Sequence, residues 1–551
     1  MALLASWTWL DVVANLRFPD EEARLWYLPC LDTVVLFGAL ALAARLGRRV
    51  PPLLAGVLAF LFLCVRLLRF GDGISRHFFR RPFHVYTNLS LLPELPRLLH
   101  TTMSTWALGF LAVTLVAGLV VLTLVSYAAV RVAERCLLET RNRHLFGVVT
   151  VCFVALSLLP RSGVLTDVRP MPPNATARLV SEVSAIPRAR RARERVSHAV
   201  LEARARFDAA PNDLAKLGGA DVLVFIVESY GATVLEDGPQ ATRIREEYAA
   251  FETELGARGY AIAANVLASP AFGGGSWFAH AALDTGVRVT DQFEYEALCE
   301  AKPLTIAHFF DKAGYRTVLA QPATERSLAA QDYLDFDRKY LANDFSYRGP
   351  ALGWGKMPDQ YVIDFTARRE LVARDRPRFV EYALVTSHAP WFAVPSPLDD
   401  WSRVGDGSVF ASLPVRRYSS DWASIERASN AYLDTIIYDF EVLRRYLASE
   451  LHNDTLVIIV GDHQPPGAAA HGSSDYGVPI HVLSRKAALV APFLARGYAA
   501  GMTPRGAGPH PGLESFLFAF LRDFSTDLRQ TRTRTPISAG LRAPAIGGLT
   551  Q

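Results

Sequence analysis

The sequence predicts an N-terminal transmembrane helical bundle followed by an α/β domain with a mostly parallel central sheet. The uncharged run at residues 106–130 is longer than the ~20 helical residues that cross a bilayer core. Two β-branched apolar runs, VLVFIV at 222–227 and TLVIIV at 455–460, are typical of strands buried on both faces. Strand and helix patterns alternate from residue 220 to about residue 523, as in α/β domains.

The composition agrees with a membrane protein of more than one domain. The chain has 551 residues, of which 50% are hydrophobic, and this is more apolar surface than a soluble chain of that size needs. A net charge of +4 is too small to indicate a nucleic-acid partner. Because Cys299 is the single cysteine between residues 220 and 525, no disulfide is expected within that part.

Four membrane spans are predicted, and residues 1–16 form either a fifth span or an interfacial helix. The four segments are residues 28–45, 51–68, 106–130 and 145–160. With four spans, two arginine-rich loops fall on one side, which the positive-inside rule makes cytoplasmic; they contain Arg45, Arg48 and Arg49, and Arg131, Arg135, Arg141 and Arg143. The loop from Phe70 to Thr102, with Arg76, Arg80 and Arg81, opposes this orientation. The large segment after Pro160 is therefore predicted outside, which is the periplasm in a Gram-negative envelope.

Four regions follow from these patterns. Residues 1–160 are the transmembrane part, 161–219 a basic juxtamembrane linker, 220–525 the catalytic domain and 526–551 a disordered tail. The arginine-dense helix from Arg188 to Arg206 is either a solvated linker or a surface helix on anionic lipid heads.

Polar side chains follow both buried strands directly. Glu228 and Ser229 follow the first strand, and Gly461, Asp462 and His463 end the second. Ligands collect at the carboxyl ends of strands in open α/β sheets. The glycine loop FGGGS places Ser276 at the first turn of a helix, where backbone N–H groups and the helix dipole favour an anion.

These residue types indicate a metal-assisted group-transfer site. A serine hydroxyl is a poor nucleophile at neutral pH, and a metal ion beside it stabilises the alkoxide. The mixed oxygen and nitrogen ligands suit Mn²⁺ or Zn²⁺ better than Ca²⁺, and Mg²⁺ is the third candidate. The alternatives for Glu228, Asp462 and His463 are a helix cap or a buried ion pair. A nucleotide phosphate loop at 273–276 is disfavoured, because no Gly-Lys-Ser/Thr ending is present.

Five ordered pieces resemble the alkaline phosphatase and sulfatase superfamily, specifically its membrane-anchored lipoteichoic acid synthases and phosphoglycerol or phosphoethanolamine transferases. The pieces are the strand ending in Glu228-Ser229, the glycine loop with Ser276, the strand ending in SHAPW (387–391), the helix AYLDTIIYDFEVL and Gly461-Asp462-His463. The resemblance implies an alkaline phosphatase/sulfatase-like fold. It also implies that Glu228, Asp462 and His463 bind one divalent metal, and that Ser276 coordinates it and acts as the nucleophile.

The chain departs from the family patterns at three positions. Ser276 replaces the usual threonine of the membrane-anchored branch, although either hydroxyl can do the chemistry. Phe278 and His280 replace the Pro and Arg of the sulfatase signature that directs formylglycine formation. Unmodified Ser276 cannot supply aldehyde-hydrate chemistry, so phosphoryl transfer is favoured over sulfate ester hydrolysis.

Other histidines and tryptophans are candidate substrate contacts. The resemblance places His388 where the branch keeps a substrate-binding histidine. His280 lies one helical turn after Ser276 on the same face. Trp277 and Trp391 flank the expected site as pocket walls or sugar-stacking platforms. His471, in a Gly/Ala/Ser loop, and His481, in the strand-like VPIHVL, are further contributors; exposure and core packing are their respective alternatives.

The function expected from the sequence is metal-dependent transfer of a phosphoglycerol or phosphoethanolamine group. The donor is a membrane phospholipid, the acceptor an envelope glycan or lipid, and the intermediate is linked to Ser276. Two alternatives stay open: a periplasmic hydrolase of phosphodiesters, phosphonates or sulfate esters, and a catalytically silent glycan-binding receptor.

Overall fold

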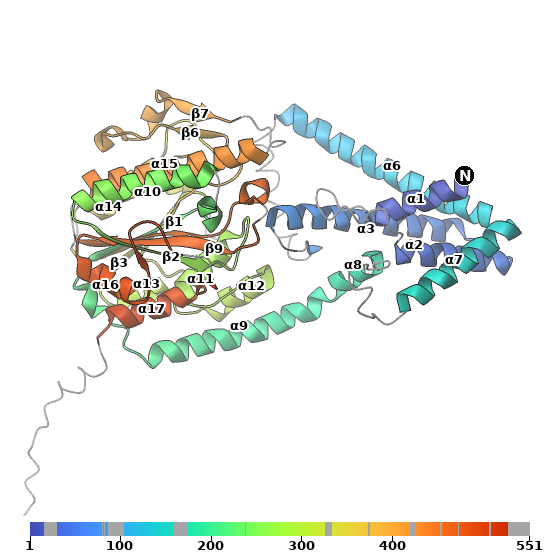
Figure 1. Ribbon diagram of the computed structural model, residues 1–551, viewed down its shortest axis with the longest axis horizontal. Helices are drawn as coiled ribbons and strands as arrows, with labels where there is room; N and C mark the ends of the chain where they lie inside the picture. Colours follow the sequence, from blue (N-terminus) through green and yellow to red (C-terminus); the bar gives the residue numbers. More distant parts are fainter. Residues whose placement is uncertain are drawn as a thin grey trace, which may run out of the picture.

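A computed structural model shows an elongated molecule with helices at one end and an α/β domain at the other (Figure 1). It describes residues 1–15, 30–79, 81, 83–85, 104–158, 174–236, 239–325, 333–372, 375–418, 425–451, 454–471, 473–505 and 509–526. The predicted tail lies outside these residues except for Thr526. The helical end followed by an α/β domain confirms the predicted architecture.

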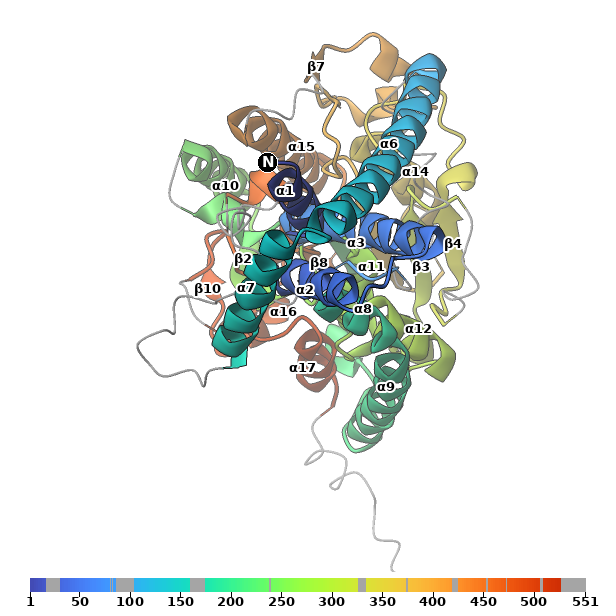
Figure 2. The ribbon, with the colours of Figure 1, turned by 90° about the vertical axis from the view of Figure 1, so that its right-hand side faces the viewer.

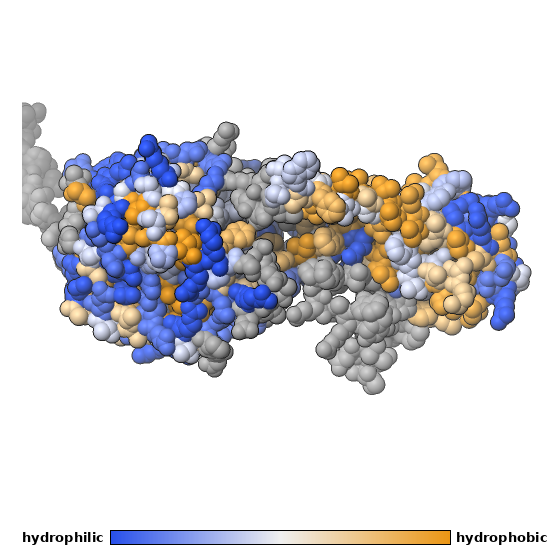
Figure 3. Space-filling model, turned by 90° about the horizontal axis from the view of Figure 1, so that it is seen from above, coloured by the Kyte–Doolittle hydropathy of each residue, from blue (hydrophilic) through white to orange (hydrophobic). Residues whose placement is uncertain are grey.

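The helical end contains α1 (Ala2–Asn15), α2 (Leu31–Arg45), α3 (Pro52–Phe79), α6 (Thr105–Leu137) and α7 (Thr140–Leu158). They pack around a small apolar core that includes Leu10, Phe37, Ala41 and Val130. Much of α6 is exposed and apolar, for example Phe110, Val116 and Leu124, and hydrophobic surface gathers over this end of the molecule (Figure 3).

Two of the described helices, α3 and α6, are long and apolar enough to cross a membrane. Residues 31–45 of the predicted segment 28–45 form α2, whose 15 residues rise only about 22 Å, short of the ~30 Å bilayer core. The segment 145–160 lies in α7, which begins with the polar sequence TRNRH. The predicted four spans are therefore not confirmed beyond α3 and α6.

The two arginine-rich loops lie side by side at one end of the helices. Arg131 donates to the carbonyl of Val50 at 2.8 Å, and Arg143 donates to that of Ala44 at 3.5 Å. This end is remote from the α/β domain (Figure 1). The arrangement agrees with an orientation in which the arginines are cytoplasmic and the α/β domain is outside.

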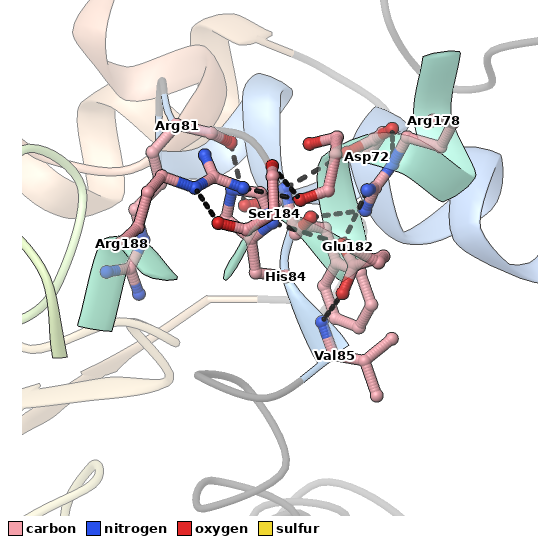
Figure 4. Close-up of polar contacts among 11 residues, drawn as sticks. Asp72, Arg81, His84, Val85, Arg178, Glu182, Ser184 and Arg188 are labelled. Carbon is pink, nitrogen blue, oxygen red and sulfur yellow. Dashed lines mark hydrogen bonds and ion pairs between the residues drawn. The ribbon is translucent and has the colours of Figure 1, made fainter. Parts of the chain in front are cut away.

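A buried ion pair joins α3 to α8 (Asn174–Val183), as Figure 4 shows. Arg178 lies 2.6 Å from Asp72, pairs with Glu182 and donates to the carbonyl of Phe83. His84 Nδ1 lies 3.0 Å from the same Glu182. The side chains of Arg178 and Asp72 are 7% and 4% exposed, so water screens this link poorly.

The helix α9 (Ala185–Asp208) carries the chain from α8 to the α/β domain. Its apolar face, with Val196, Val200 and Phe207, belongs to the domain core, and the helix packs against α12 (Gln292–Ala301). The basic face forms exposed ion pairs between Arg193 and Glu300 and between Arg195 and Glu294. One face of α9 is thus buried in the domain core. Neither the interpretation as a solvated linker nor that as a helix on lipid heads included this burial.

The α/β domain is built on an eight-stranded sheet of order β10-β2-β9-β8-β1-β5-β3-β4. The strands are β1 (Asp221–Val227), β2 (Ala261–Ala268), β3 (Arg316–Gln321), β4 (Arg338–Leu341), β5 (Arg378–Ala383), β8 (Thr455–Gly461), β9 (Gly477–Ser484) and β10 (Ala499–Ala500). The five strands from β8 to β4 run parallel, and β9 is antiparallel to both β8 and β2. A separate pair, β6 (Ala393–Pro395) and β7 (Val415–Arg417), is antiparallel.

Helices cover both faces of the sheet (Figure 1). One face carries α11 (Ser276–Thr285), α12, α13 (Ile306–Lys312), α16 (Ala487–Ala495) and α17 (Ser515–Phe524). The other carries α10 (Pro239–Ala257), α14 (Asp359–Glu370) and α15 (Ile425–Ser449). In β1, Val222, Val224 and Ile226 enter one core while Leu223, Phe225 and Val227 enter the other. Burial on both faces explains the unbroken apolar run of this strand.

The outer end of α3 abuts the α/β domain where the glycine loop lies. A Cβ added to Gly273 would lie 2.0 Å from the carbonyl oxygen of Phe78, and one added to Gly274 would lie 3.0 Å from the ring of Phe79. Viewed from the helical end, α3 lies across the region of β8 and α11 (Figure 2). The helix that is most central to the membrane part therefore reaches the loop before Ser276.

Removing the buried arginine should weaken the link between the two parts. We expect Arg178→Met to cost about 3–5 kcal/mol of unfolding free energy, because Asp72 would stay buried without its partner. Thermal unfolding of the full chain in detergent measures the loss. Arg193→Met removes an exposed pair and should cost no more than about 1 kcal/mol. Equal losses in both variants would contradict the prediction.

Candidate active site

The carboxyl ends of β1 and β8 bring Glu228 and Asp462 together. These strands are parallel neighbours with Val227 opposite Gly461, so the residue after each strand lies at the same edge. Gly461 permits this contact, because a Cβ there would lie 1.8 Å from the carbonyl oxygen of Tyr230. Glycine is therefore needed at position 461 because the two strands pack closely, and not because the backbone has a positive φ.

One oxygen of Asp462 is fixed by the backbone and the other is left without a hydrogen bond. Oδ1 accepts from the N–H groups of Ser229 and His463, both at 2.7 Å. Oδ2 is buried, accepts no hydrogen bond from the residues that the structure describes and lies 3.5 Å from Nε2 of His463. An unpaired carboxylate oxygen costs free energy when buried, so its position calls for a cation.

His463 turns its Nε2 into the cluster. Its Nδ1 lies 2.8 Å from the carbonyl oxygen of Gln464, which orients the ring. Nε2 lies 3.2 Å from Glu228 Oε1. Burial alone would lower the pKa of His463, but the carboxylates of Asp462 and Glu228 raise it to about 9 overall. A cation that binds Nε2 would displace that proton.

Ser276 lies at the same point, at the start of α11. Gly273, Gly274 and Gly275 precede it with φ of 68°, 142° and 84°, which non-glycine residues rarely adopt. Ser276 Oγ lies 3.0 Å from Glu228 Oε2 and 3.1 Å from His463 Nε2. The structure therefore brings together all four predicted residues of the metal site.

The donor set fits a divalent cation. Ligand atoms of Glu228, Asp462 and His463 all lie within 4.8 Å of one another, and these residues are buried. Two carboxylates, an imidazole and a hydroxyl are suitable ligands for Zn²⁺ or Mn²⁺. Among the described residues, this is the one group of three or more His, Cys, Asp or Glu side chains that could hold a metal ion.

A cavity of about 290 Å³ extends from Ser276 into the domain. Glu228, Trp277, His280 and His388 are among the residues that line it. The ring of His388 stacks on Trp354 with centroids 5.0 Å apart. Burial lowers the pKa of His280 to about 4 and also lowers that of His388, so both imidazoles are neutral near pH 7.

Three other predicted residues lie away from the cavity lining. Trp391 is buried in the second core and donates from Nε1 to the carbonyl of Ser387 at 2.7 Å. His481 is buried in β9 with Nε2 2.8 Å from the hydroxyl of Tyr230. His471 is exposed and contacts Gln240. Core packing was the alternative for His481 and exposure the alternative for His471, and the structure agrees with both.

Sequence reasoning missed five other residues that line the cavity. They are Asp284, Tyr295, Tyr333, Trp354 and Glu381. Two of them carried a signal: Asp284 lies eight residues after Ser276 on the same helix, and Glu381 is an acid inside the core strand FVEYALVT.

Part of the α/β domain is similar to a known protein family. Residues 287–485 match the family model Sulfatase. The match includes Asp462 and His463 and begins after Glu228 and Ser276. No curated protein matches the chain.

Similar solved structures are remote. The Streptococcus pyogenes phosphoglycerol transferase GacH, in complex with sn-glycerol-1-phosphate, is 13% identical over 60% of this chain and 92% of that chain, with a TM-score of 0.35. The C-terminal periplasmic domain of EcEptC from Escherichia coli, in complex with Zn, is 11% identical over 54% and 80%, also at 0.35. A Vibrio parahaemolyticus protein in the alkaline phosphatase superfamily is 16% identical, with a TM-score of 0.35. The match covers 48% of this chain and 60% of that chain.

Filling the space at Gly461 should disturb the site. We expect Gly461→Ala to cost about 1–3 kcal/mol of unfolding free energy, because its methyl group overlaps the Tyr230 carbonyl. Gly256→Ala is the matched control, since a Cβ there meets no atom within 4 Å in α10. That variant should be neutral or more stable by up to about 1 kcal/mol. Thermal unfolding compares the two, and a Gly461→Ala variant as stable as the control would contradict the packing argument.

Proposed function

We propose that this chain, an enzyme whose α/β domain carries a sulfatase-family segment, transfers a phosphate-linked head group from a membrane phospholipid to an envelope glycan or lipid. The observation that carries the proposal is the position of Ser276 Oγ. It lies about 3 Å from both Glu228 and His463, at the mouth of a cavity and within a donor set that fits a divalent cation.

The reaction proceeds in two displacements at phosphorus. In the first, Ser276 Oγ forms a bond to phosphorus and the bond to the diacylglycerol oxygen breaks. Ser276 loses its hydroxyl proton and the diacylglycerol oxygen gains one, so a phosphodiester on Ser276 results. In the second, an acceptor hydroxyl oxygen bonds phosphorus, and Ser276 recovers its proton as the P–Oγ bond breaks.

Each group of the site has a part in these steps. The N-terminus of α11 and the glycine loop present backbone N–H groups to the phosphate anion. Glu228, Asp462, His463 and Ser276 would hold Mn²⁺, Zn²⁺ or Mg²⁺, which supplies charge stabilisation for the serine oxygen and the phosphoryl oxygens. The neutral imidazoles of His280 and His388 line the cavity beside the phosphate position and can donate hydrogen bonds to it.

The membrane part supports a lipid donor over a soluble one. The end of α3 meets the glycine loop at Gly273, so the nucleophile is held beside a helix that can span the bilayer. A phospholipid does not leave the bilayer, and its head group must therefore be reached from close to the surface. With the arginine-rich loops at the opposite end of the helices, the site faces the periplasmic or outer side.

Trapping the covalent intermediate tests the proposal. After incubation of the full chain with labelled phosphatidylethanolamine or phosphatidylglycerol, peptide mass mapping should find the head-group phosphate on Ser276. Ser276→Ala should lose turnover by on the order of 10³-fold or more, because the nucleophile is removed.

Ser276→Thr is the matched variant, since it keeps a hydroxyl, and it should retain part of the activity. An adduct on another residue, or turnover by Ser276→Ala at the wild-type rate, would contradict the proposal. Release of the head group to water without any acceptor product would identify the hydrolase instead.

A further inference from the structure

The cavity continues beyond the phosphate position along one face of α11. Ser276, His280 and Asp284 recur every four residues on this helix, and all three line the cavity. Ser276 and Asp284 are separated by about 12 Å along the helix axis, at ~1.5 Å per residue. Asp284 therefore marks the end of the cavity that is remote from the nucleophile.

Glu381 approaches the same end from the sheet. It lies in the middle of β5, opposite Val224 of β1 and Leu319 of β3. Phe379, two residues earlier and thus on the same side of the strand, belongs to the core under α11. The relative exposures of Asp284 and Glu381 are 1% and 2%, so two acidic side chains share one buried place.

These two acids have no compensating positive charge in the described part of the chain. Asp284 Oδ1, Asp284 Oδ2 and Glu381 Oε2 are buried and accept no hydrogen bond from any other residue there, while the two carboxyl groups contact each other. Burial raises the pKa of both groups, and each is further affected by the other; the pKa of Glu381 reaches about 7. The pair therefore holds a proton unless a cationic group lies beside it.

Aromatic side chains also line the cavity that contains the pair. Trp277, Tyr295, Tyr333 and Trp354 line the same cavity. Buried carboxylates and aromatic faces both stabilise an organic cation, the former through charge-assisted hydrogen bonds and the latter through the ring quadrupole.

We propose that Asp284 and Glu381 form a subsite for a primary ammonium group at the end of the transferred head group. Three carboxylate oxygens of this pair accept no hydrogen bond from another described residue, and they can accept the three N–H donors of an ammonium. This inference rests on the proposed function and sharpens it: the head group is a phosphoalkylamine such as phosphoethanolamine, rather than phosphoglycerol.

The dimensions agree with a short amine. Phosphorus and nitrogen of phosphoethanolamine are joined by four bonds of about 1.5 Å each, and a contact of roughly 3 Å at either end gives about 10–12 Å in all. This matches the separation of Ser276 and Asp284. A second metal ion fits less well, because the described residues at this end provide two carboxylates and no third charged or imidazole ligand.

A donor competition tests the subsite. Vesicles that contain equal amounts of phosphatidylethanolamine, phosphatidylglycerol and phosphatidylcholine are incubated with the full chain, and the three possible Ser276 adducts are distinguished by mass. We expect the ethanolamine adduct to exceed the glycerol adduct at least about tenfold. The choline adduct should be lowest, because its nitrogen has no N–H.

The double variant Asp284→Asn, Glu381→Gln should lower the ratio of ethanolamine to glycerol adduct by about tenfold or more, since the charge is removed at nearly constant shape. The control is Asp439→Asn, which replaces a buried acid that lies beside Asp359 and does not line the cavity. It should leave the ratio unchanged. If the double variant does not fold, Asp284→Asn alone is used, because the remaining carboxylate can accept from the new amide.

Two outcomes would overturn the subsite. One is an unchanged ratio in a folded double variant, which would make the acids a structural pair. The other is loss of a second bound metal ion in that variant, which would make them a metal site.

A binding measurement separates this inference from the proposed function. Ser276→Ala is titrated by calorimetry with O-phosphoethanolamine, phosphocholine and glycerol phosphate. We expect O-phosphoethanolamine to bind about tenfold more tightly than the other two compounds. This preference should be lost when Asp284→Asn and Glu381→Gln are added to Ser276→Ala. Such a result supports the subsite even if no lipid yields an adduct. Equal binding of the three compounds would refute the subsite while the Ser276 adduct could still establish the transfer reaction.

Discussion

The close parallel contact between β1 and β8 is the constraint on which the site depends. It places Glu228 and Asp462 at one edge of the sheet, and it is possible because Gly461 leaves room for the Tyr230 carbonyl. Two buried carboxylates side by side repel each other, and one oxygen of Asp462 has no hydrogen-bond partner in the described part of the chain. The fold thus stabilises an arrangement whose charge is balanced when a cation binds.

The membrane helices fix the position of this site relative to the bilayer. The end of α3 meets the glycine loop, and the buried Asp72–Arg178 pair connects the same helix to α8, which leads into α9 and the domain core. The α/β domain is therefore attached to the helical end through two routes rather than through one flexible linker. A nucleophile held in this way is suited to a substrate that stays in a bilayer.

The sequence predicted features that depend on local pattern and missed those that depend on tertiary contacts. The apolar runs before Glu228 and Asp462, and the glycines before Ser276, identified strand ends and a helix start that the structure confirms. The span predicted from apolar content at residues 28–45 stays a prediction, because α2 has only 15 residues. Trp391 turns into the core because its N–H binds the Ser387 carbonyl, a contact that no spacing reveals. Asp284 and Glu381 meet only through the packing of α11 on β5, although an acid inside a core strand was a visible signal.

The central claim is that Glu228, Asp462, His463 and Ser276 share one cation, and metal binding to the full chain tests it most directly. We expect one Mn²⁺ per chain, with the nitrogen coupling of a single imidazole in its electron paramagnetic resonance spectrum. Asp462→Asn and His463→Gln should each weaken binding by at least about 100-fold, and the nitrogen coupling should vanish in the second variant. Wild-type affinity in both variants, with the nitrogen coupling retained, would contradict the account.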